Sequence, residues 1–336
     1  MIYIRPIPMC DPATVPDALC LGGGWCRFSH VEVLERGRAP QVLPVAELSA
    51  AQTAMLTADR GAFGGVSMQT PRIMGILNVT PDSFSDGGQF DRPEAALMAA
   101  RRMAADADII DIGGESTRPG AVEVETREEI ARTAPVIAAL RDAGIARPVS
   151  VDTRKAAVAQ AALAAGAGIV NDVSAMTFDP AMSRMVAEAG APVILMHSVG
   201  NPQTMQDDPR YGDVLLDVYD ALRHRVARAE AAGIARSHIA IDPGIGFGKT
   251  LADNLALLAR LSLFHSLGLP VLLGASRKRF IGTLSGEDEA ARRMPGSIAV
   301  AMAGVAQGVQ MIRVHDVAET RQALRLWQAV TKGANP

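Results

Sequence analysis

From Pro71 onward, the sequence repeats one pattern eight times: a short apolar run, a polar or glycine-rich loop, and an alanine-rich stretch. The apolar runs are rich in Val, Ile and Leu without polar alternation, which is typical of parallel strands buried on both faces. We expect strands at Arg72–Val79, Ile109–Gly113, Pro148–Asp152, Ile169–Val173, Pro192–His197, Ile239–Asp242, Pro270–Ala275 and Met311–His315. Eight such units in about 260 residues favour an α/β fold of the closed (β/α)8 TIM-barrel type, with a doubly wound open sheet as the alternative.

Helices are expected between the strands, because charged residues recur there on one face. The clearest examples are Pro93–Ala107, Glu128–Ala143 and Val214–Ala232. A glycine follows several such stretches and suits a helix C-terminus that needs a positive φ. These glycines are Gly144, Gly166, Gly190 and Gly233.

Residues 1–70 lack this repeat. They contain short β-like pieces at His30–Leu34 and Gln41–Val45, a Gly22–Gly24 run and several prolines. We interpret them as an N-terminal α+β extension packed on the barrel, which itself comprises residues 71–336. The alternative is an interaction module, although no residue in this segment selects a partner.

Composition excludes several classes of protein. The 33 basic and 36 acidic residues give a net charge of −3, which argues against a nucleic-acid partner. The N-terminus has no apolar signal region, and glycines and a proline interrupt the longest uncharged stretch, Met294–Ile312, so no membrane association is expected. Cys10, Cys20 and Cys26 are odd in number and form no C-x-x-C motif, so we expect unpaired thiols in a cytoplasmic protein.

Polar residues cluster where the predicted strands end. In a barrel, the C-terminal ends of the strands meet at one mouth, where the active site lies. Packing alone would not place carboxylates, amides and basic groups together there. The residues are Asn78, Asp111, Asp152, Asn171, His197, Asp242, Ser276, Arg313 and His315.

Two long loops begin at this mouth. Residues 78–88 carry Phe84 in a chain with only 4% aromatic residues, which indicates either a lid over a substrate or an ordinary turn. Residues 111–120 place Thr117 and Arg118 where their hydrogen-bond donors can bind an anion. Neither loop is specific by itself.

Asp152, Asn171 and Asp242 follow three different strands. Two carboxylates and an amide suit a ligand with an N–H-rich edge, and each charge-assisted hydrogen bond contributes about 1.5–3 kcal/mol. The alternative is that each residue caps a helix, as Asp152 would before Arg154. Three such residues at one rim favour the ligand.

Positive charge follows the last two strands. Arg313 and His315 are two residues apart on a strand and therefore point to the same side, where both can reach one anion. Ser276-Arg-Lys-Arg279 adds further cations, and phosphate sites commonly lie beside these loops of the fold. The run Gly244–Thr250 resembles a nucleotide-binding P-loop but has Pro243 where the first glycine is required.

In combination, these motifs closely resemble those of the dihydropteroate synthase family. The resemblance covers residues 71 to 332 and rests on motifs that occur in the family's order. They are Met74–Gly88, Asp111–Gly120, Ser150–Lys155, Asn171–Ser174, Asp242–Gly244, Gly246–Lys249, Ser276–Lys278 and Arg313–Asp316.

The resemblance implies roles for individual residues. Asp152, Asn171, Asp242 and Lys278 would hold a pterin ring, with Met196 as an apolar wall. Asn78, Thr117, Arg118, Arg313 and His315 would surround a pyrophosphate, and Asn78 would also help to bind Mg2+. Phe84, Pro119, Phe247 and Lys278 would line a 4-aminobenzoate pocket, which in this family also admits sulfonamides. Arg279 stands where some relatives have a small hydroxyl residue.

The resemblance further implies a homodimeric transferase of folate biosynthesis. It would join 6-hydroxymethyl-7,8-dihydropterin pyrophosphate to 4-aminobenzoate by an SN1-like substitution, in which Asp111, Asp152, Asp242 and Lys278 are catalytic. The alternatives are a pterin-dependent methyltransferase with a corrinoid partner, which has no need for the pyrophosphate cluster, and a pterin-binding paralogue without activity.

Overall fold

The computed structural model describes residues 1–11, 15, 17–79, 92–116, 120–200 and 209–332. Its largest sheet has eight strands in the order β13-β12-β11-β10-β9-β8-β15-β14, and every paired neighbour is parallel. A parallel bridge between Ile241 and Val271 joins the two outer strands and closes the barrel. The strands are β8 (Arg72–Asn78), β9 (Ile109–Gly113), β10 (Val149–Asp152), β11 (Ile169–Asp172), β12 (Val193–Met196), β13 (Ile239–Asp242), β14 (Leu272–Leu273) and β15 (Met311–Val314). The predicted TIM barrel is confirmed, and the open-sheet alternative is wrong.

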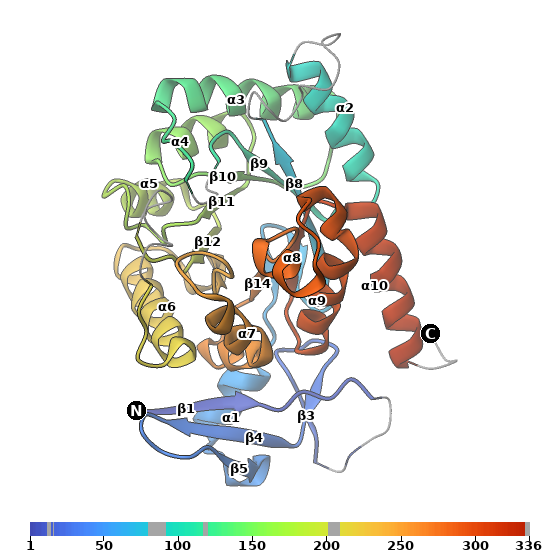
Figure 1. Ribbon diagram of the computed structural model, residues 1–336. Coiled ribbons are helices and arrows are strands. Elements are labelled where there is room, and N and C mark those ends of the chain that lie inside the picture. Colours follow the sequence, from blue (N-terminus) through green and yellow to red (C-terminus); the bar gives the residue numbers. More distant parts are fainter. Residues whose placement is uncertain (12–14, 16, 80–91, 117–119, 201–208, 333–336) are drawn as a thin grey trace.

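Helices surround the barrel (Figure 1). They are α2 (Arg92–Ala104), α3 (Thr126–Asp142), α4 (Ala156–Ala164), α5 (Met182–Ala189), α6 (Val214–Ala231), α7 (Leu251–Ala259), α8 (Arg279–Ser285), α9 (Met294–Ala306) and α10 (Val317–Lys332), with 3-10 turns at η3 (Arg236–His238), η4 (Leu261–Leu267) and η5 (Ala290–Arg293). The four glycines predicted at helix ends, Gly144, Gly166, Gly190 and Gly233, have φ values of 73°, 108°, 59° and 97°, which confirms that prediction.

The seventh strand is shorter than predicted. Only Leu272 and Leu273 form β14, whereas the apolar run suggested Pro270–Ala275. Pro270 has no N–H to donate to a ladder, and its carbonyl instead accepts the Ile241 N–H at 3.0 Å. The run is therefore buried throughout but is paired as a strand over two residues only.

The barrel has two hydrophobic clusters, and the N-terminal segment has a third of its own. The larger cluster fills the space between strands and helices. A smaller cluster lies inside the barrel near the N-terminal ends of its strands, and we call it the barrel floor. Its buried members are Phe63, Met68, Met74, Ile109, Ile169, Ile194, Ala240, Leu272 and Met311. Phe63 and Met68 precede the first barrel strand, so the N-terminal segment closes this end of the barrel.

A hairpin positions Phe63 in the barrel floor. Strand β6 (Ala62–Phe63) pairs with β7 (Val66–Ser67) through Gly64 and Gly65. Their φ values of 56° and 81° fit a two-residue turn with positive φ at both positions, which L side chains adopt at a cost. A Cβ on Gly64 would lie 2.7 Å from Ile169 Cγ1, whereas one on Gly65 would meet no atom within 4 Å.

This difference gives a matched pair of variants. Gly64→Ala should lower the free energy of unfolding by about 2–5 kcal/mol, combining the left-handed backbone with overpacking against Ile169. Gly65→Ala carries only the backbone cost of about 1–2 kcal/mol. Urea denaturation would measure both losses, provided that the two variants and the unchanged protein have the same m-value. Equal losses in the two variants would contradict the close contact with Ile169.

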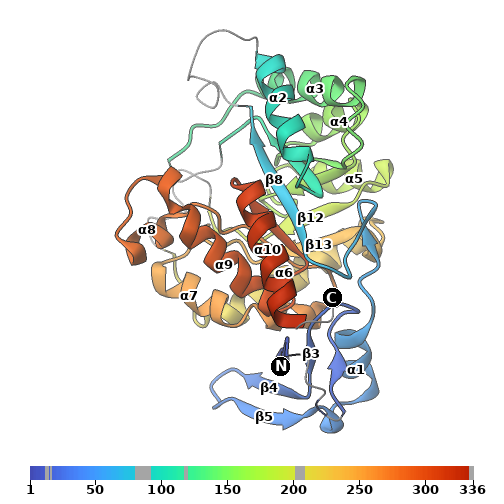
Figure 2. The same cartoon turned by 90° about the vertical axis from the view of Figure 1, so that its right-hand side faces the viewer.

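The rest of the N-terminal segment lies below α6, α7 and α9 (Figures 1 and 2). It contains an antiparallel sheet of β1 (Ile2–Pro6), β4 (His30–Glu35) and β5 (Gln41–Pro44), a hairpin of β2 (Leu19–Cys20) and β3 (Arg27–Phe28), the 3-10 turn η1 (Val45–Glu47) and α1 (Ala50–Thr57). The predicted strands near residues 30 and 41 are confirmed. Tyr3 Oη donates to Asp220 Oδ2 at 2.8 Å, and Arg36 pairs with Asp217 at 2.6 Å, so the segment is anchored on α6.

Among the described residues, no helix is long and apolar enough to cross a membrane.

Candidate active site

The C-terminal strand ends bring the predicted polar residues to one mouth of the barrel. Asp152 ends β10, Asp242 ends β13, and Asn171 and Arg313 each precede the last residue of their strands. Strand pairing also places side chains of adjacent strands next to each other. Asp152, for example, is opposite Asn171 in the register of β10 and β11. The barrel therefore gathers residues that are far apart in the sequence.

A buried ion-pair centre occupies this mouth. Arg313 donates through Nε to Asp111 Oδ2 and through Nη2 to Asp152 Oδ2, each at 2.6 Å. Asn171 Nδ2 also donates to Asp111 Oδ2, at 3.1 Å. The other oxygens, Asp111 Oδ1 and Asp152 Oδ1, are buried without a hydrogen-bond partner in the described part of the chain. Because an unsatisfied buried acceptor is costly, these two oxygens are suited to accept N–H groups from a ligand.

The surroundings change the ionisation of these groups. Burial raises the pKa of Asp152 to about 7; the Asp111 charge adds to the rise and Arg313 opposes it. Burial also raises the pKa of Asp242, although Lys278 opposes the rise. For Lys278, burial lowers the pKa to about 8 against the opposing effect of Asp242. One acid, Asp152, and one base, Lys278, of the mouth thus have pKa values close to neutral pH.

Lys278 lies between the carboxylates and an aromatic ring. Its ammonium group donates to the Ile245 carbonyl and is 4.5 Å from the centroid of the Phe247 ring. Asp242 Oδ1 accepts the Gly244 N–H at 2.7 Å, which fixes the turn that carries Phe247. A Cβ at Gly244 would overlap the His197 carbonyl, so this turn requires glycine. The cation, carboxylate and ring form one wall of the mouth.

The strand-end residues predicted to bind pyrophosphate lie in this region. His315 Nδ1 is 3.0 Å from Ser276 Oγ, and its backbone N–H also donates to that oxygen. Arg277 beside them pairs with Asp316. The Asn78 side-chain oxygen lies near Gly113, 3.5 Å from the position that a Cβ would take there.

Four predicted site residues lie outside the described residues. They are Phe84, Thr117, Arg118 and Pro119. Their assignment to the aminobenzoate and pyrophosphate sites stays a prediction.

The helix-capping alternative is wrong for Asp152 of β10 and Asn171 of β11. Helix α4 has Lys155 at its N-cap position and no side-chain cap. Asp152 instead accepts from Arg313, and Asn171 donates to Asp111. The contacts of both side chains therefore point into the mouth rather than to a helix terminus.

The P-loop-like run also has a structural role that differs from phosphate binding. Lys249 is 3% exposed, and its ammonium donates to the carbonyls of Gly244 at 2.8 Å and Phe247 at 3.0 Å. It also lies 3.0 Å from His197 Nδ1. Lys249 thus ties the turn after β13 to the end of β12.

A second buried network, which was not predicted from the sequence, includes Glu115 and Glu129. Glu115 accepts from Arg154 at 3.1 Å and Lys155 at 3.3 Å, and Lys155 also donates to Glu129 at 2.7 Å. Thr153 adds a hydrogen bond to Glu129 at 2.7 Å. This network joins the loop after β9 to the loop after β10. The sequence does show charged residues directly after apolar strands, which indicates that some of them are buried ion pairs. It does not show which of these residues pair with each other.

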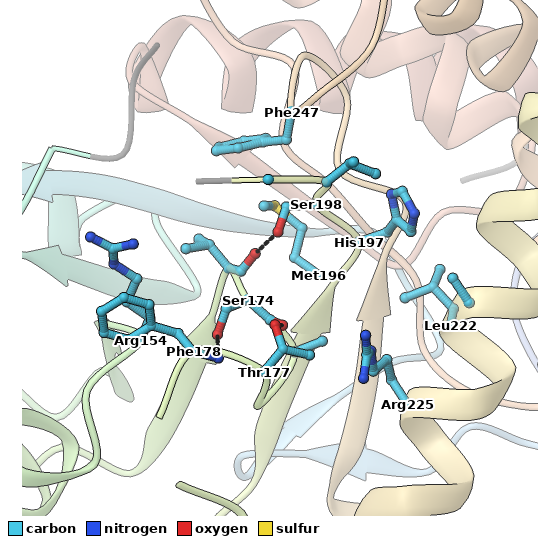
Figure 3. Close-up of a pocket in the computed structure, with 15 residues that line it drawn as sticks. Arg154, Ser174, Thr177, Phe178, Met196, His197, Ser198, Leu222, Arg225 and Phe247 are labelled. Atoms are coloured by element: carbon cyan, nitrogen blue, oxygen red, sulfur yellow. Dashed lines mark hydrogen bonds between the residues drawn. The ribbon is translucent and has the colours of Figure 1, made fainter. Parts of the chain in front are cut away.

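A cavity of about 500 Å³ lies beside the mouth. Figure 3 shows Met196 and Phe247 along it, together with Arg154, Phe178 and Arg225. Met196 is 4% exposed and lines this cavity, and its role beside a pterin ring stays a prediction. The mouth and the cavity together offer buried acceptors, cations and apolar walls, which suit a flat polar ring carrying an anionic substituent.

Comparisons with known proteins identify the family. A family model described as "Pterin binding enzyme" matches residues 74–315. The dihydropteroate synthase of Escherichia coli is 46% identical over 265 residues, which cover 79% of this chain and 93% of that protein. A structure of Xanthomonas albilineans dihydropteroate synthase with 4-aminobenzoic acid has 48% identity and a TM-score of 0.75, covering 81% of this chain and 96% of that one. Another, in complex with 7,8-dihydropteroate, has 45% identity and a TM-score of 0.73, covering 81% and 97%. The chain therefore belongs to the pterin-binding enzyme family, as a member of its dihydropteroate synthases.

Proposed function

We propose that this chain condenses 6-hydroxymethyl-7,8-dihydropterin pyrophosphate with 4-aminobenzoate to give 7,8-dihydropteroate and pyrophosphate. The observation that carries the proposal is the buried centre of Asp111, Asp152 and Arg313, in which two carboxylate oxygens lack partners among the described residues. A dihydropterin ring has an N–H-rich edge for those acceptors. The relatives with 4-aminobenzoic acid and 7,8-dihydropteroate support the same reaction.

The pterin ring would lie at the bottom of the mouth. Asp152, Asn171 and Asp242 would face its N–H and N atoms, Lys278 would donate to its carbonyl edge, and Met196 would cover one face. Arg313 and His315 would hold the pyrophosphate together with Asn78, Thr117 and Arg118. Phe247 and Lys278, with Phe84 and Pro119, would line the aminobenzoate pocket.

In the reaction, the C–O bond between the pterin methylene and the pyrophosphate breaks, and the pyrophosphate leaves with the electron pair. The resulting cation is conjugated with the dihydropterin ring. Asp152 and Asp242, with Asp111 nearby, stabilise it because opposite charges attract strongly in a dry site. The aminobenzoate nitrogen then attacks the methylene carbon and loses a proton. A covalent pterin–enzyme adduct trapped during turnover would contradict this SN1-like course.

Mg2+ fits the proposed site as an ion that arrives with the substrate. Within the described ranges, no group of three or more His, Cys, Asp or Glu side chains is placed to bind a metal. Mg2+ commonly uses one or two protein oxygens and the phosphates of a substrate, and Asn78 would supply such an oxygen. When bound, the ion neutralises the charge that builds up on the leaving pyrophosphate.

The direct test is to incubate the purified protein with Mg2+ and both substrates and to detect dihydropteroate by mass. Product that requires both substrates supports the proposal. Binding of the pterin pyrophosphate without product would favour the inactive paralogue, and absence of binding would contradict the site.

Chelation of Mg2+ should abolish most of the turnover and leave the melting temperature unchanged. We further propose that the protein is a homodimer in the cytoplasm. Sedimentation velocity of the purified protein would test the dimer, and fractionation of cells followed by detection of the protein would test the location.

The pKa values of the mouth predict a bell-shaped pH dependence of kcat/KM. As pH falls through about 7, Asp152 becomes protonated and its oxygens no longer act as a carboxylate. As pH rises through about 8, Lys278 loses its proton and its charge. Steady-state rates between about pH 5 and about pH 10 would define both limbs. Lys278→Arg should remove the alkaline limb, because a guanidinium stays protonated throughout this range; an unchanged limb would mean that another group titrates.

A further inference from the structure

Cys10 and Cys26 lie opposite each other on two neighbouring extended segments. Met9 and Arg27 exchange both backbone hydrogen bonds, at 2.7 and 2.9 Å, and form an antiparallel bridge. The next pair in this register is Cys10 and Cys26, in the position without backbone hydrogen bonds, where Cα atoms are typically about 4.5 Å apart. A disulfide bridges Cα separations of about 4.4–6.8 Å. The two Sγ atoms are 3.1 Å apart, so the side chains already point toward each other.

The two thiols differ in access. Cys26 is 1% exposed, whereas Cys10 is half-buried. The hydrogen bond from Cys26 lowers the pKa of the Cys10 thiol, and the same contact, with burial, raises the pKa of Cys26. Cys10 is therefore the thiol that a small molecule can reach and that ionises more readily. Cys20 is exposed, lies opposite Arg27 in the register of the β2–β3 hairpin, and directs its Sγ to the Gly24 carbonyl at 3.2 Å.

Both sulfurs also contact the barrel. Cys10 Sγ is 3.4 Å from the Ala306 carbonyl oxygen, and Cys26 Sγ is 3.7 Å from the same oxygen. Ala306 is the last residue of α9, and the Trp25 indole N–H donates to the Val305 carbonyl at 2.9 Å. Each thiol has a single S–H, which is placed to serve either the other sulfur or a carbonyl at the C-terminal end of this barrel helix.

We infer that Cys10 and Cys26 are a modification site, at which a small disulfide oxidant such as oxidised glutathione produces an intrachain disulfide. The Cys10 thiolate attacks one sulfur of the oxidant and releases one small thiol. The Cys26 sulfur then attacks Cys10 Sγ in the mixed disulfide and releases the second. Two protein thiols are oxidised, the oxidant disulfide is reduced, and the two protein protons end on the two released thiols.

The bond would change the N-terminal segment in two ways. It closes a loop between residues 16 positions apart, which restricts the unfolded chain. It also removes both S–H donors from the end of α9 and leaves the Trp25 hydrogen bond in place. Oxidation therefore stiffens the extension where it contacts the barrel.

The experiment counts alkylated cysteines in the folded full chain. Protein treated with dithiothreitol or with oxidised glutathione is denatured in iodoacetamide, and its intact mass and peptides are measured. The reduced protein should carry three alkyl groups, one for each of its three cysteines. The oxidised protein should carry one, on Cys20, and yield a cross-linked peptide with Cys10 and Cys26. Three alkyl groups after oxidation, glutathione retained on Cys10, or a cross-link through Cys20 would overturn the inference.

Two variants separate the pair from the third thiol. Cys20→Ser should still form the bond and retain no alkylation site after oxidation. Cys10→Ser replaces a half-buried thiol by a smaller hydroxyl and should leave Cys20 and Cys26 alkylated under both conditions. In the Cys20→Ser protein, oxidation should raise the melting temperature, because the cross-link restricts the unfolded chain. A lower melting temperature would contradict the unstrained geometry on which the inference rests.

Discussion

Asp242→Asn should lower kcat/KM for the pterin pyrophosphate by about 100- to 1,000-fold, a loss of about 3–4 kcal/mol in transition-state stabilisation. Asp242 is 5% exposed, and its Oδ1 already accepts the Gly244 N–H. In the variant, the amide oxygen would keep that bond, and the NH2 group would face the donors of the pterin ring. Lys278 would also lose the carboxylate that balances its charge.

Steady-state kinetics with varied pterin pyrophosphate and saturating aminobenzoate would measure this effect. Asp253→Asn is a matched control, because Asp253 follows the same strand but forms the capping box of α7 with Thr250. It should cost about 1 kcal/mol of stability and leave kcat/KM within about twofold. Turnover of Asp242→Asn equal to that of the unchanged protein at low substrate would remove Asp242 from the proposed site.

Arg313→Met should reduce both stability and activity. The variant leaves Asp111 and Asp152 without their shared counter-charge, and breaking a buried ion pair from one side costs about 3–5 kcal/mol. The pKa of Asp152 should rise further, because Arg313 is the group that opposes its rise. If Arg313 holds the pyrophosphate as proposed, loss of this cation should lower kcat/KM by about 1,000-fold. Urea denaturation and steady-state kinetics would separate the two effects.

A second substitution tests the origin of the stability loss. Asp111→Asn combined with Arg313→Met removes one buried charge of each sign, so part of the lost stability should return while activity stays low. Arg184→Met is the surface control: its pairing with Glu188 is exposed, and its loss should change stability by at most about 0.5 kcal/mol. If the double variant were less stable than Arg313→Met, the uncompensated carboxylate would not be the cause.

The sequence predicted the barrel well because each strand is buried on both faces, which leaves an apolar run such as Ile109–Gly113 with few other interpretations. It also placed Asp152, Asn171 and Asp242 at one mouth, since the C-terminal ends of parallel strands must meet there. It did not predict that Arg313 pairs with Asp111 and Asp152, because that contact depends on side-chain directions across the barrel.

Other features depended on contacts between loops. Lys249 appeared in the sequence as part of an incomplete phosphate motif, whereas its partners are carbonyls of the surrounding turn and the end of β12. The cysteines were predicted to be unpaired because their number is odd and their spacing matches no motif, and all three are free thiols in the structure. The sequence did not show that two of them lie side by side. Only the bridge between Met9 and Arg27 brings Cys10 opposite Cys26.

The hairpin with Phe63 imposes an order on the assembly of the molecule. During synthesis it leaves the ribosome before every strand that will surround it, so Phe63 and Met68 stay in water until β11, β13 and β14 have been made. The barrel floor can form only when early and late parts of the chain meet, which makes it a contact of long sequence separation. For the same reason, a shortened chain that starts at β8 would lack two of the floor residues, Phe63 and Met68.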